Sequence, residues 1–430
     1  MLSDNISRDE KGVLHFAGRS VPALAEQYGT PLYLMDEERI RYNMRMYTHA
    51  FAESFRPGSL PLYASKAASF KAIYRIAKKE GMGVDCVSCG EIATALSAGF
   101  PADNIYYHGN CKTDADIRYA VERGVGCFVV DNAEELTALE RIAGKLGKCQ
   151  RVLLRLSPGI DPHTYAEVST GMVDSKFGAA VETGQAMELV KLALSRPHIL
   201  TEGVHCHVGS QVFDEDVYER TLDIMLPFMA QVRSETGVTL SALNMGGGYG
   251  VRYRESDKRV DIPARIAAVG AHFRELCARL DFPEPKMLME PGRSIVADAG
   301  MTLYTVGAVK HIPGYKSYVI VDGGMADNPR YALYKAPYTV YHATKGGVLM
   351  LCDLAGRCCE SGDMIQPKIT LPADTCRGDL VAVCTTGAYN YSMASNYNRL
   401  GRPPVVMLSE NGDYVAVKRE SIEDLLRLDV

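Results

Sequence analysis

Polar residues that could take part in chemistry recur at the ends of eight short apolar runs in this sequence. In chain order they are Lys66, Asp85 with Ser88, His108, Asp131, Arg155, His207 with Ser210, Gly246 to Gly248, and Glu290 with Arg293. Each residue alone has an ordinary explanation, such as an ion pair at the rim of a fold. Their recurrence at eight matching positions is difficult to explain by folding needs and indicates one shared site.

Lys66 has the chemistry of a covalent catalyst. It ends the apolar run LPLYASK (residues 60–66), where an ammonium group is costly unless it is paired or deprotonated. A desolvated lysine with a lowered pKa is what Schiff-base formation requires. The alternative is a lysine at the rim of the fold that is paired with Asp85.

The segment NMGGGYG (residues 244–250) predicts a phosphate site. Gly246, Gly247 and Gly248 present bare backbone, whose amide N–H groups can approach a phosphate closely. In α/β barrels a phosphate is often bound after the seventh and eighth strands. A simple tight turn is the alternative for such a run.

Two further segments suit a cofactor that contains a pyridine ring. In EPGRS (residues 290–294), the Glu290 carboxylate would keep a ring nitrogen protonated and so strengthen the ring as an electron sink. An internal ion pair with Arg293 is the alternative. In HCHVGSQ (residues 205–211), the His207 ring could stack on the cofactor and the Ser210 hydroxyl could reach a phosphate, whereas a histidine satisfied within the core is the alternative.

A second group of candidates lies after residue 300. The segments DNPRYALY, RCCESGD and TGAYNYSMASNYN contain Arg330, Tyr334, Cys359, Glu360 and Tyr389. Adjacent cysteines beside an acidic residue in a glycine turn are unlike core packing. As isolated features, all of these residues are also typical of ordinary loops.

The runs that carry the first set read as strands separated by amphipathic helices. They cover residues 60–66, 83–88, 104–109, 126–131, 151–158, 203–210, 242–248 and 286–293. Between them, segments such as NAEELTALERIAGKLG place apolar residues at i, i+3 and i+4 spacing. Eight alternations of strand and helix predict a (β/α)8 barrel with its active site at the carboxyl ends of the strands. A doubly wound open sheet is the competing fold.

The remaining segments predict a separate all-β domain. After about Asp298, runs such as MTLYTVGAVKHI and DLVAVCTTG are rich in strand-forming residues, with turn residues between them. The N-terminal run PLYLM precedes the barrel and is expected to pair with this β domain. We therefore predict an N-terminal segment at residues 1–35, a barrel at 36–300 and a C-terminal β domain at 301–430.

Composition argues against several classes of partner. The 430 residues carry a formal net charge of -5 and no basic block, so nucleic acid and acidic membranes gain no electrostatic support as partners. The polar N-terminus has no apolar signal region, and the 12 cysteines are scattered, which predicts a cytoplasmic protein with reduced thiols. Cys86 and Cys89 form a single CxxC without a second pair, so we expect no metal site.

Taken together and in this order, the motifs resemble those of the fold-type III pyridoxal-phosphate-dependent decarboxylases. They read YASKA, GVDCVSCGE, HGN, DSKFG, GVHCHVGSQ, NMGGGYG, EPGRS, CESGD and GAYNYSMASNYN. Within that group they are most similar to the diaminopimelate decarboxylases. The resemblance runs from about Tyr63 to Asn398 and covers both predicted domains.

The resemblance implies a role for each candidate. The catalytic residues would be Lys66, which carries pyridoxal 5'-phosphate as a Schiff base, His207, which stacks on the ring, and Cys359, which returns a proton to Cα. The cofactor would be surrounded by Lys66, Asp85, His207, Ser210, Gly246, Gly247, Gly248, Glu290, Gly292, Arg293 and Tyr389. The substrate's distal end would contact Arg293, Arg330, Tyr334, Glu360 and Tyr389. Cys359 and Glu360 would reach the active site of the neighbouring subunit, which implies a homodimer.

The charges of the candidates favour one substrate. Diaminopimelate carries a carboxylate and an ammonium at its distal end, which suit Arg330 and Glu360, whereas ornithine, lysine and arginine carry only a cation there. We expect decarboxylation of meso-2,6-diaminopimelate to L-lysine, the last step of lysine biosynthesis. The alternatives are a decarboxylase of another doubly charged amino acid such as carboxynorspermidine, a racemase of the same barrel class, and a non-enzymatic protein, either a cofactor carrier or a catalytically dead regulator of a related enzyme. The residues that depart from the family pattern are Ser157, Tyr331, Lys335 and Cys358.

Overall fold

The computed structural model describes residues 1–160 and 175–430, and the chain divides into two compact units. We call one the barrel unit; it comprises Asn43–Gly250 and Val260–Gly292. We call the other the sheet unit; it comprises Met1–Tyr42, Val251–Arg259 and Arg293–Val430. Across the described residues, no helix combines the length and apolar character needed to cross a membrane.

The barrel unit is built on a closed ring of eight parallel strands. Their order around the ring is β5, β6, β7, β8, β9, β11, β12 and β13, and pairing of β13 with β5 closes it. The strands are β5 (Leu60–Ala64), β6 (Gly83–Cys86), β7 (Ile105–Tyr107), β8 (Cys127–Val130), β9 (Gln150–Ser157), β11 (Ile199–His205), β12 (Ala242–Asn244) and β13 (Lys286–Met289). A short strand, β10 (Ala179–Ala180), pairs with β9 outside the ring. The predicted barrel is confirmed, and the open-sheet alternative is wrong.

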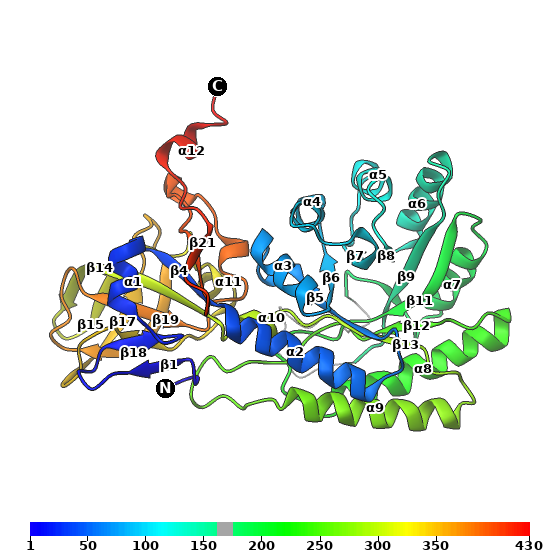
Figure 1. Ribbon diagram of the computed structural model, residues 1–430, viewed down its shortest axis with the longest axis horizontal. Coiled ribbons are helices and arrows are strands. Elements are labelled where there is room, and N and C mark those ends of the chain that lie inside the picture. The colour runs from blue at the N-terminus through cyan, green and yellow to red at the C-terminus, as the bar shows by residue number, and fades with distance from the viewer. Residues whose placement is uncertain (161–174) are drawn as a thin grey trace. The chain divides into compact units, whose positions relative to one another are not determined.

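Helices lie outside the ring and connect its strands (Figure 1). The connecting helices are α3 (Lys71–Lys79), α4 (Cys89–Ser97), α5 (Asp114–Glu122), α6 (Ala133–Lys145), α7 (Gln185–Leu194), α8 (Val217–Thr236) and α9 (Ile262–Arg279), whereas α2 (Glu37–Ser54) leads into β5. Polar residues beyond the strands start several of them, since a side-chain oxygen there accepts from a free backbone N–H of the first turn. Ser88 accepts from Glu91 N at 3.2 Å and Asn132 from Glu135 N at 2.9 Å. Ser88, one of the polar strand ends, is therefore a helix cap.

The sheet unit contains the N-terminal strand and the β-rich C-terminal part. Strand β4 (Leu32–Asp36) pairs antiparallel with β14 (Gly300–Ile312) and parallel with β20 (Val405–Leu408), which confirms the predicted pairing of the N-terminal run. The other strands are β1 (Ile6–Arg8), β2 (Leu14–Phe16), β3 (Arg19–Ser20), β15 (Lys316–Val321), β16 (Val340–His342), β17 (Leu349–Ala355), β18 (Met364–Pro372), β19 (Leu380–Cys384) and β21 (Tyr414–Val417). Short helices α1 (Val21–Tyr28), α10 (Arg293–Val296), α11 (Arg330–Tyr334) and α12 (Ile422–Leu426) complete it. The domain limits at residues 35 and 300 stay a prediction.

A buried ion pair joins the ends of β7 and β8. Lys112 Nζ lies 2.7 Å from Glu135 Oε1 and donates to the carbonyl oxygens of Gly109 and Val129 at 2.8 and 2.9 Å. The second Glu135 oxygen accepts from Asp131 N at 3.0 Å. Burial lowers the pKa of Lys112 and raises the pKa of Glu135, so each group depends on the other to stay charged.

Replacing Lys112 by Met should lower the free energy of unfolding by about 3–5 kcal/mol, because Glu135 would remain as a buried charge without its cation. Urea unfolding followed by circular dichroism measures the change. The double variant Lys112→Met/Glu135→Leu should recover most of the loss. Lys191→Met, which breaks the exposed pair with Glu235, is the matched control and should change little. Equal effects of the two single variants would contradict a structural role for the buried pair.

Candidate active site

Glu290 lies at the centre of a buried polar cluster in the barrel unit. It follows β13, and its Oε1 accepts from Asn244 Nδ2 and lies 2.7 Å from His108 Nε2. Its Oε2 lies 3.2 Å from His205 Nε2. The ligand atoms of Glu290 and the two histidines are within 4.8 Å of one another. Residues after β7, at the ends of β11 and β12, and after β13 thus converge on one carboxylate.

The cluster holds Glu290 as an anion. Burial opposes its ionisation, but the histidine partners outweigh burial and hold the pKa of Glu290 well below its usual range. Burial lowers the pKa of His205 to about 4, so this ring is neutral near pH 7. His205 Nδ1 has no hydrogen-bond partner within the described residues, which agrees with a neutral ring that donates through Nε2.

Asp85, on β6, and His207, just after β11, are titratable groups at the ends of two ring strands that are not adjacent. Asp85 is 2% exposed, and burial, reinforced by the negative charge of Glu290, raises its pKa. Burial, together with the positive charges of Lys66 and Arg155, lowers the pKa of His207 well below its usual range. At neutral pH this end of the barrel therefore combines the ionised Glu290 carboxylate with the neutral imidazole of His207.

Lys66 is exposed to solvent, whereas the sequence predicted a desolvated lysine. Strand β5 ends at Ala64, and the chain enters a short 3-10 turn in which Ser65 and Ala67 are buried while Lys66 is exposed. The turn is fixed through Glu91, whose Oε2 accepts from the Ser65 hydroxyl and from Val87 N, both at 2.7 Å. The barrel therefore holds the backbone at Lys66 but does not by itself desolvate the amine.

The glycine run after β12 is packed too tightly for any side chain. A Cβ on Gly247 would lie 2.1 Å from Glu290 O, and one on Gly246 would lie 2.7 Å from both Cys206 O and His207 Nδ1. Gly248 has φ +143°, and a Cβ there would lie 2.7 Å from Gly209 O. Bare backbone is needed here, as expected for a segment that approaches a phosphate.

In the sheet unit, two buried guanidiniums share one tyrosine. Arg293 is 7% exposed and Arg330 6% exposed, and each donates through Nη1 to the Tyr253 oxygen, at 2.8 and 3.0 Å. Arg330 also donates to the Tyr338 hydroxyl at 2.9 Å. The Tyr389 ring lies 4.8 Å from the Arg293 guanidinium carbon and 5.9 Å from that of Arg330. This arrangement concentrates positive charge and suits an anionic ligand.

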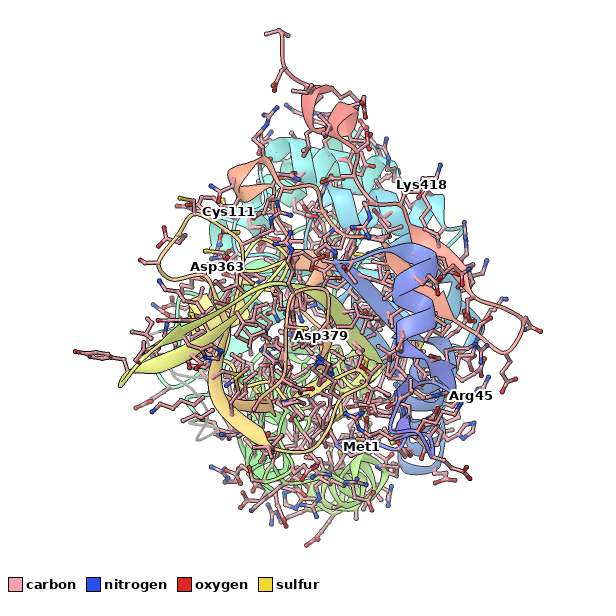
Figure 2. The ribbon with its side chains drawn as sticks, turned by 90° about the vertical axis from the view of Figure 1, so that its left-hand side faces the viewer. Met1, Arg45, Cys111, Asp363, Asp379 and Lys418 are labelled. Atoms are coloured by element: carbon pink, nitrogen blue, oxygen red, sulfur yellow. The ribbon has the colours of Figure 1, made fainter. Side chains whose placement is uncertain are left out.

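The loop that carries Cys359 and Glu360 is exposed at its tip and anchored at its base. Asp363, labelled in Figure 2, is 2% exposed and accepts from the backbone N–H groups of Met325 and Cys358, both at 2.6 Å. Cys359 N donates to Asn398 Oδ1 at 2.7 Å. The Cys359 thiol and the Glu360 carboxylate are exposed, so the anchors fix the backbone while the reactive groups remain accessible.

The candidates therefore fall into three groups. The barrel unit brings Asp85, His207 and the glycine run to the end of the barrel that carries the Glu290 carboxylate. Lys66, Ser210 and Gly292 lie on turns at the same end. The sheet unit gathers Arg293, Arg330 and Tyr389. Tyr334, Cys359 and Glu360 form the third group and are exposed. Of the motif DSKFG, Asp174 lies outside the described residues; Ser157, which departs from the family pattern, donates to Phe177 O at 2.7 Å.

Sequence reasoning missed His205, Asn244, Tyr253, Tyr338 and Asp363 as members of these clusters. His205 had a usable signal, because residues two apart on a strand point to the same side and His207 was already a candidate. Asn244 and Tyr253 contact residues far apart in the chain, which spacing does not reveal. Tyr338 and Asp363 lie near Arg330 and Cys358 in the chain, but no periodic pattern singles them out.

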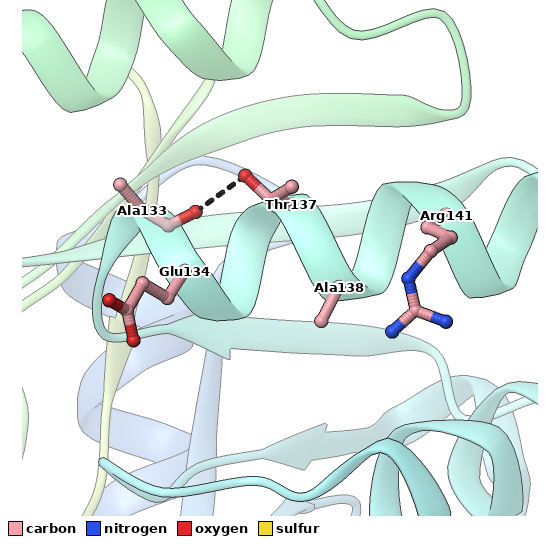
Figure 3. A pocket seen from close by; sticks show the side chains of 5 residues that line it. All are labelled: Ala133, Glu134, Thr137, Ala138 and Arg141. Carbon is pink, nitrogen blue, oxygen red and sulfur yellow. Dashed lines mark hydrogen bonds between the residues drawn. The ribbon is translucent and has the colours of Figure 1, made fainter.

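A hollow of about 440 Å³ lies on the outer face of α6 (Figure 3). Its lining is Ala133, Glu134, Thr137, Ala138 and Arg141. The Thr137 hydroxyl donates to Ala133 O within the helix at 2.9 Å, and none of the five residues is buried. These are the features of a solvated helix face, and the hollow offers no catalytic group.

The barrel residues fit pyridoxal phosphate chemically. Glu290 accepts from Asn244 and lies beside the ring nitrogens of His108 and His205, and a carboxylate has about four acceptor positions, so it could also accept from a protonated ring nitrogen. The neutral His207 ring would not repel a cationic ring. Gly246 to Gly248 supply the bare backbone that a phosphate needs.

Comparisons with known proteins agree with this chemistry. Residues 38–297 match the family described as pyridoxal-dependent decarboxylase, pyridoxal binding domain. The chain is 42% identical to diaminopimelate decarboxylase of Bacillus subtilis (strain 168), covering 98% of this chain and 96% of that enzyme. It is 38% identical to diaminopimelate decarboxylase of Staphylococcus aureus (strain COL), covering 98% of both. A crystal structure of diaminopimelate decarboxylase from M. jannaschii in complex with L-lysine superposes with a TM-score of 0.92 at 34% identity, covering 100% of this chain and 99% of that chain.

The low pKa of His205 predicts a loss of stability in mild acid. Its folded pKa of about 4 lies below the unfolded value of 6.5, so the unfolded chain binds the extra proton first as the pH falls through 6.5. Between pH 7 and pH 5 this should remove about 2 kcal/mol from the free energy of unfolding. Urea unfolding at the two pH values measures it.

The variant His205→Gln keeps a donor towards Glu290 but does not titrate, so it should lose that much less stability over the same pH interval. His49→Gln, which changes an exposed histidine of the same unit, is the matched control and should keep the wild-type pH dependence. An unaltered pH dependence in His205→Gln would show that His205 is not the group responsible.

Proposed function

Because this chain belongs to the family of pyridoxal-dependent decarboxylases, we propose that it removes CO2 from meso-2,6-diaminopimelate and releases L-lysine, the last step of lysine biosynthesis. The observation that carries the choice of substrate is the pair of buried guanidiniums, Arg293 and Arg330. The distal carboxylate of diaminopimelate suits them, because guanidiniums form strong charge-assisted hydrogen bonds with carboxylates. Ornithine, lysine, arginine and carboxynorspermidine present only cationic groups at that end, which two buried guanidiniums would repel.

The barrel residues would bind and tune the cofactor. Pyridoxal phosphate supplies an electron sink for the electron pair released when the Cα–carboxylate bond breaks. Lys66 would hold the cofactor through its amino group until the substrate amine replaces it. Glu290, kept anionic by its buried donors, would hold a proton at the ring nitrogen. His207, neutral at pH 7, would lie against the ring without adding positive charge.

The remaining barrel assignments concern the phosphate and the charge around Glu290. Ser210 and the backbone of Gly246 to Gly248 and of Gly292 would bind the phosphate, and Tyr389 of the sheet unit would also contact the cofactor. Asp85 has a raised pKa beside Glu290. A second full negative charge next to Glu290 is thereby disfavoured, which leaves Glu290 as the partner of the ring nitrogen.

We propose further that Cys359 returns the proton to Cα in the active site of a second subunit. Its thiol is exposed, and the exposed Glu360 beside it would bind the distal ammonium of the substrate. Tyr334, which is 37% exposed, would contact the same end of the substrate. The Asp363 anchor supports this role, since a proton donor must be held in place to act. The active unit under this proposal is a homodimer.

All twelve cysteines are free thiols in the structure. This supports the proposal that the chain works in a reducing compartment such as the cytoplasm.

The direct test is lysine formation from meso-diaminopimelate by the purified chain with added pyridoxal phosphate. Ornithine, arginine, lysine and carboxynorspermidine are assayed in parallel for CO2 release. We expect product from diaminopimelate alone, because only its distal end carries both charges. CO2 from another candidate, with none from diaminopimelate, would keep the cofactor chemistry and replace the substrate.

Mixing two inactive variants tests the shared site. Lys66→Ala and Cys359→Ala should each have almost no activity alone, since one lacks the cofactor anchor and the other the proton donor. Co-expressed in equal amounts, they should give about a quarter of wild-type activity, because half of the dimers are mixed and each mixed dimer has one intact site. Lys66→Ala combined with the double variant Lys66→Ala/Cys359→Ala is the control and should stay inactive. No recovery in the first mixture would place both residues in the same chain's site.

A further inference from the structure

Tyr253 is the common partner of the two buried guanidiniums in the sheet unit. Its oxygen accepts from Arg293 at 2.8 Å and from Arg330 at 3.0 Å, and its side chain is itself buried. It lies in Val251–Arg259, a short stretch that belongs to the sheet unit although barrel residues flank it in the chain. The fold therefore brings this one residue to the arginines from a separate part of the sequence.

The position of the Tyr253 oxygen is fixed from several sides. Its backbone N–H donates to Asp257 Oδ2 at 3.0 Å, and its carbonyl oxygen accepts from the Thr339 hydroxyl at 2.8 Å. Its ring packs edge-on against Tyr338, with centroids 5.5 Å apart and an interplanar angle of 88°. An arginine side chain has many rotamers and gains precision only from what it binds. A fixed oxygen between two arginines sets the position of both.

The charge balance around this oxygen favours a further anion. Arg330 donates only to tyrosine oxygens among the contacts described for it, at Tyr253 and Tyr338. Its Nε is buried without a hydrogen-bond partner in the described chain. Burial would raise the pKa of Tyr253, but the two guanidiniums outweigh burial and lower it, which shows that negative charge is stabilised at this point.

We propose that Tyr253 is a positioning residue that holds Arg293 and Arg330 at one spacing for the distal carboxylate of the substrate. The inference rests on the proposed function and adds a specificity-determining residue to it. A tyrosine with a structural role alone would affect all ligands alike when altered. A positioning residue would affect only ligands that carry the carboxylate.

The test uses Tyr253→Phe, which keeps the ring and removes the oxygen, in the holoenzyme. The probes are L-lysine, which retains the distal carboxylate, and cadaverine, which is lysine without it. We expect the KM for diaminopimelate and the inhibition constant of lysine to rise about tenfold, since two hydrogen bonds to charged groups are lost. The kcat, the inhibition constant of cadaverine and the visible absorbance of the bound cofactor should stay within about twofold.

Arg330→Ala provides the coupling measurement. Alone, Arg330→Ala should raise the inhibition constant of lysine at least as much as Tyr253→Phe does, because it removes a guanidinium. If Tyr253 acts through the arginines, adding Tyr253→Phe to the Arg330→Ala variant should raise the inhibition constant of lysine by clearly less than the tenfold expected in the wild type. Full additivity of the two changes would overturn the inference.

Tyr304→Phe is the matched control, because Tyr304 is a buried tyrosine of the same unit whose hydroxyl donates to Asp327 and not to the arginines. It should leave the ratio of the lysine and cadaverine constants unchanged. Equal weakening of both probes by Tyr253→Phe, or no weakening of lysine, would overturn the inference while lysine formation by the wild type leaves the proposed function intact. A wild type that forms no lysine from diaminopimelate would overturn both.

Discussion

Burial of full charges is the constraint on which both units are built. A carboxylate or guanidinium removed from water is costly unless nearby donors or acceptors replace the lost hydration. In the barrel unit, Glu290 meets that requirement with His108, His205 and Asn244. These groups stand at the ends of different strands around the ring, so only the closed barrel supplies all of them. The Glu290 anion is therefore stabilised only when the barrel is closed.

The sheet unit buries cations instead of an anion, and it stabilises them with different groups. Arg293 and Arg330 are surrounded by phenol oxygens and aromatic faces. Phenols and aromatic rings stabilise a guanidinium less than a carboxylate does. Arg330, whose contacts among the described residues are all with tyrosines, therefore retains an attraction for an anion that a salt bridge would have satisfied. Under the proposed function, the buried anion of the barrel unit would meet a cationic ring nitrogen, whereas the buried cations of the sheet unit would meet an anionic substrate group.

Sequence reasoning predicted what depends on local pattern. The eight strands and their helices follow from apolar runs and periodicity, and the strand-end rule selected Glu290, His207 and the glycine run. It did not find Asn244 and Tyr253, because their partners lie dozens of residues away and only the closed barrel or the sheet unit brings them together. The exposure of Lys66 was also beyond reach, since it depends on where β5 stops and the next turn begins. The spacing of residues in the sequence identifies which of them lie at the carboxyl ends of the strands. It does not show which residues contact each other across the fold, because that depends on the tertiary structure.

The Cys359 loop shows how a fixed backbone and an accessible thiol can coexist. Asp363 is buried beneath the loop, and the nearby Gly324 and Gly356 leave no room for a Cβ, since one there would lie within 2.6 Å of its carboxylate oxygens. Burial raises the pKa of Asp363, and the backbone N–H groups that it accepts from act in the opposite direction. Burying the Asp363 carboxylate this tightly has a cost in stability, which the two backbone hydrogen bonds offset in part. A rigid scaffold under an exposed loop is typical of functional residues. In the proposed homodimer each loop would reach the other subunit's site, and that role would require both the anchored backbone and the exposed thiol of Cys359.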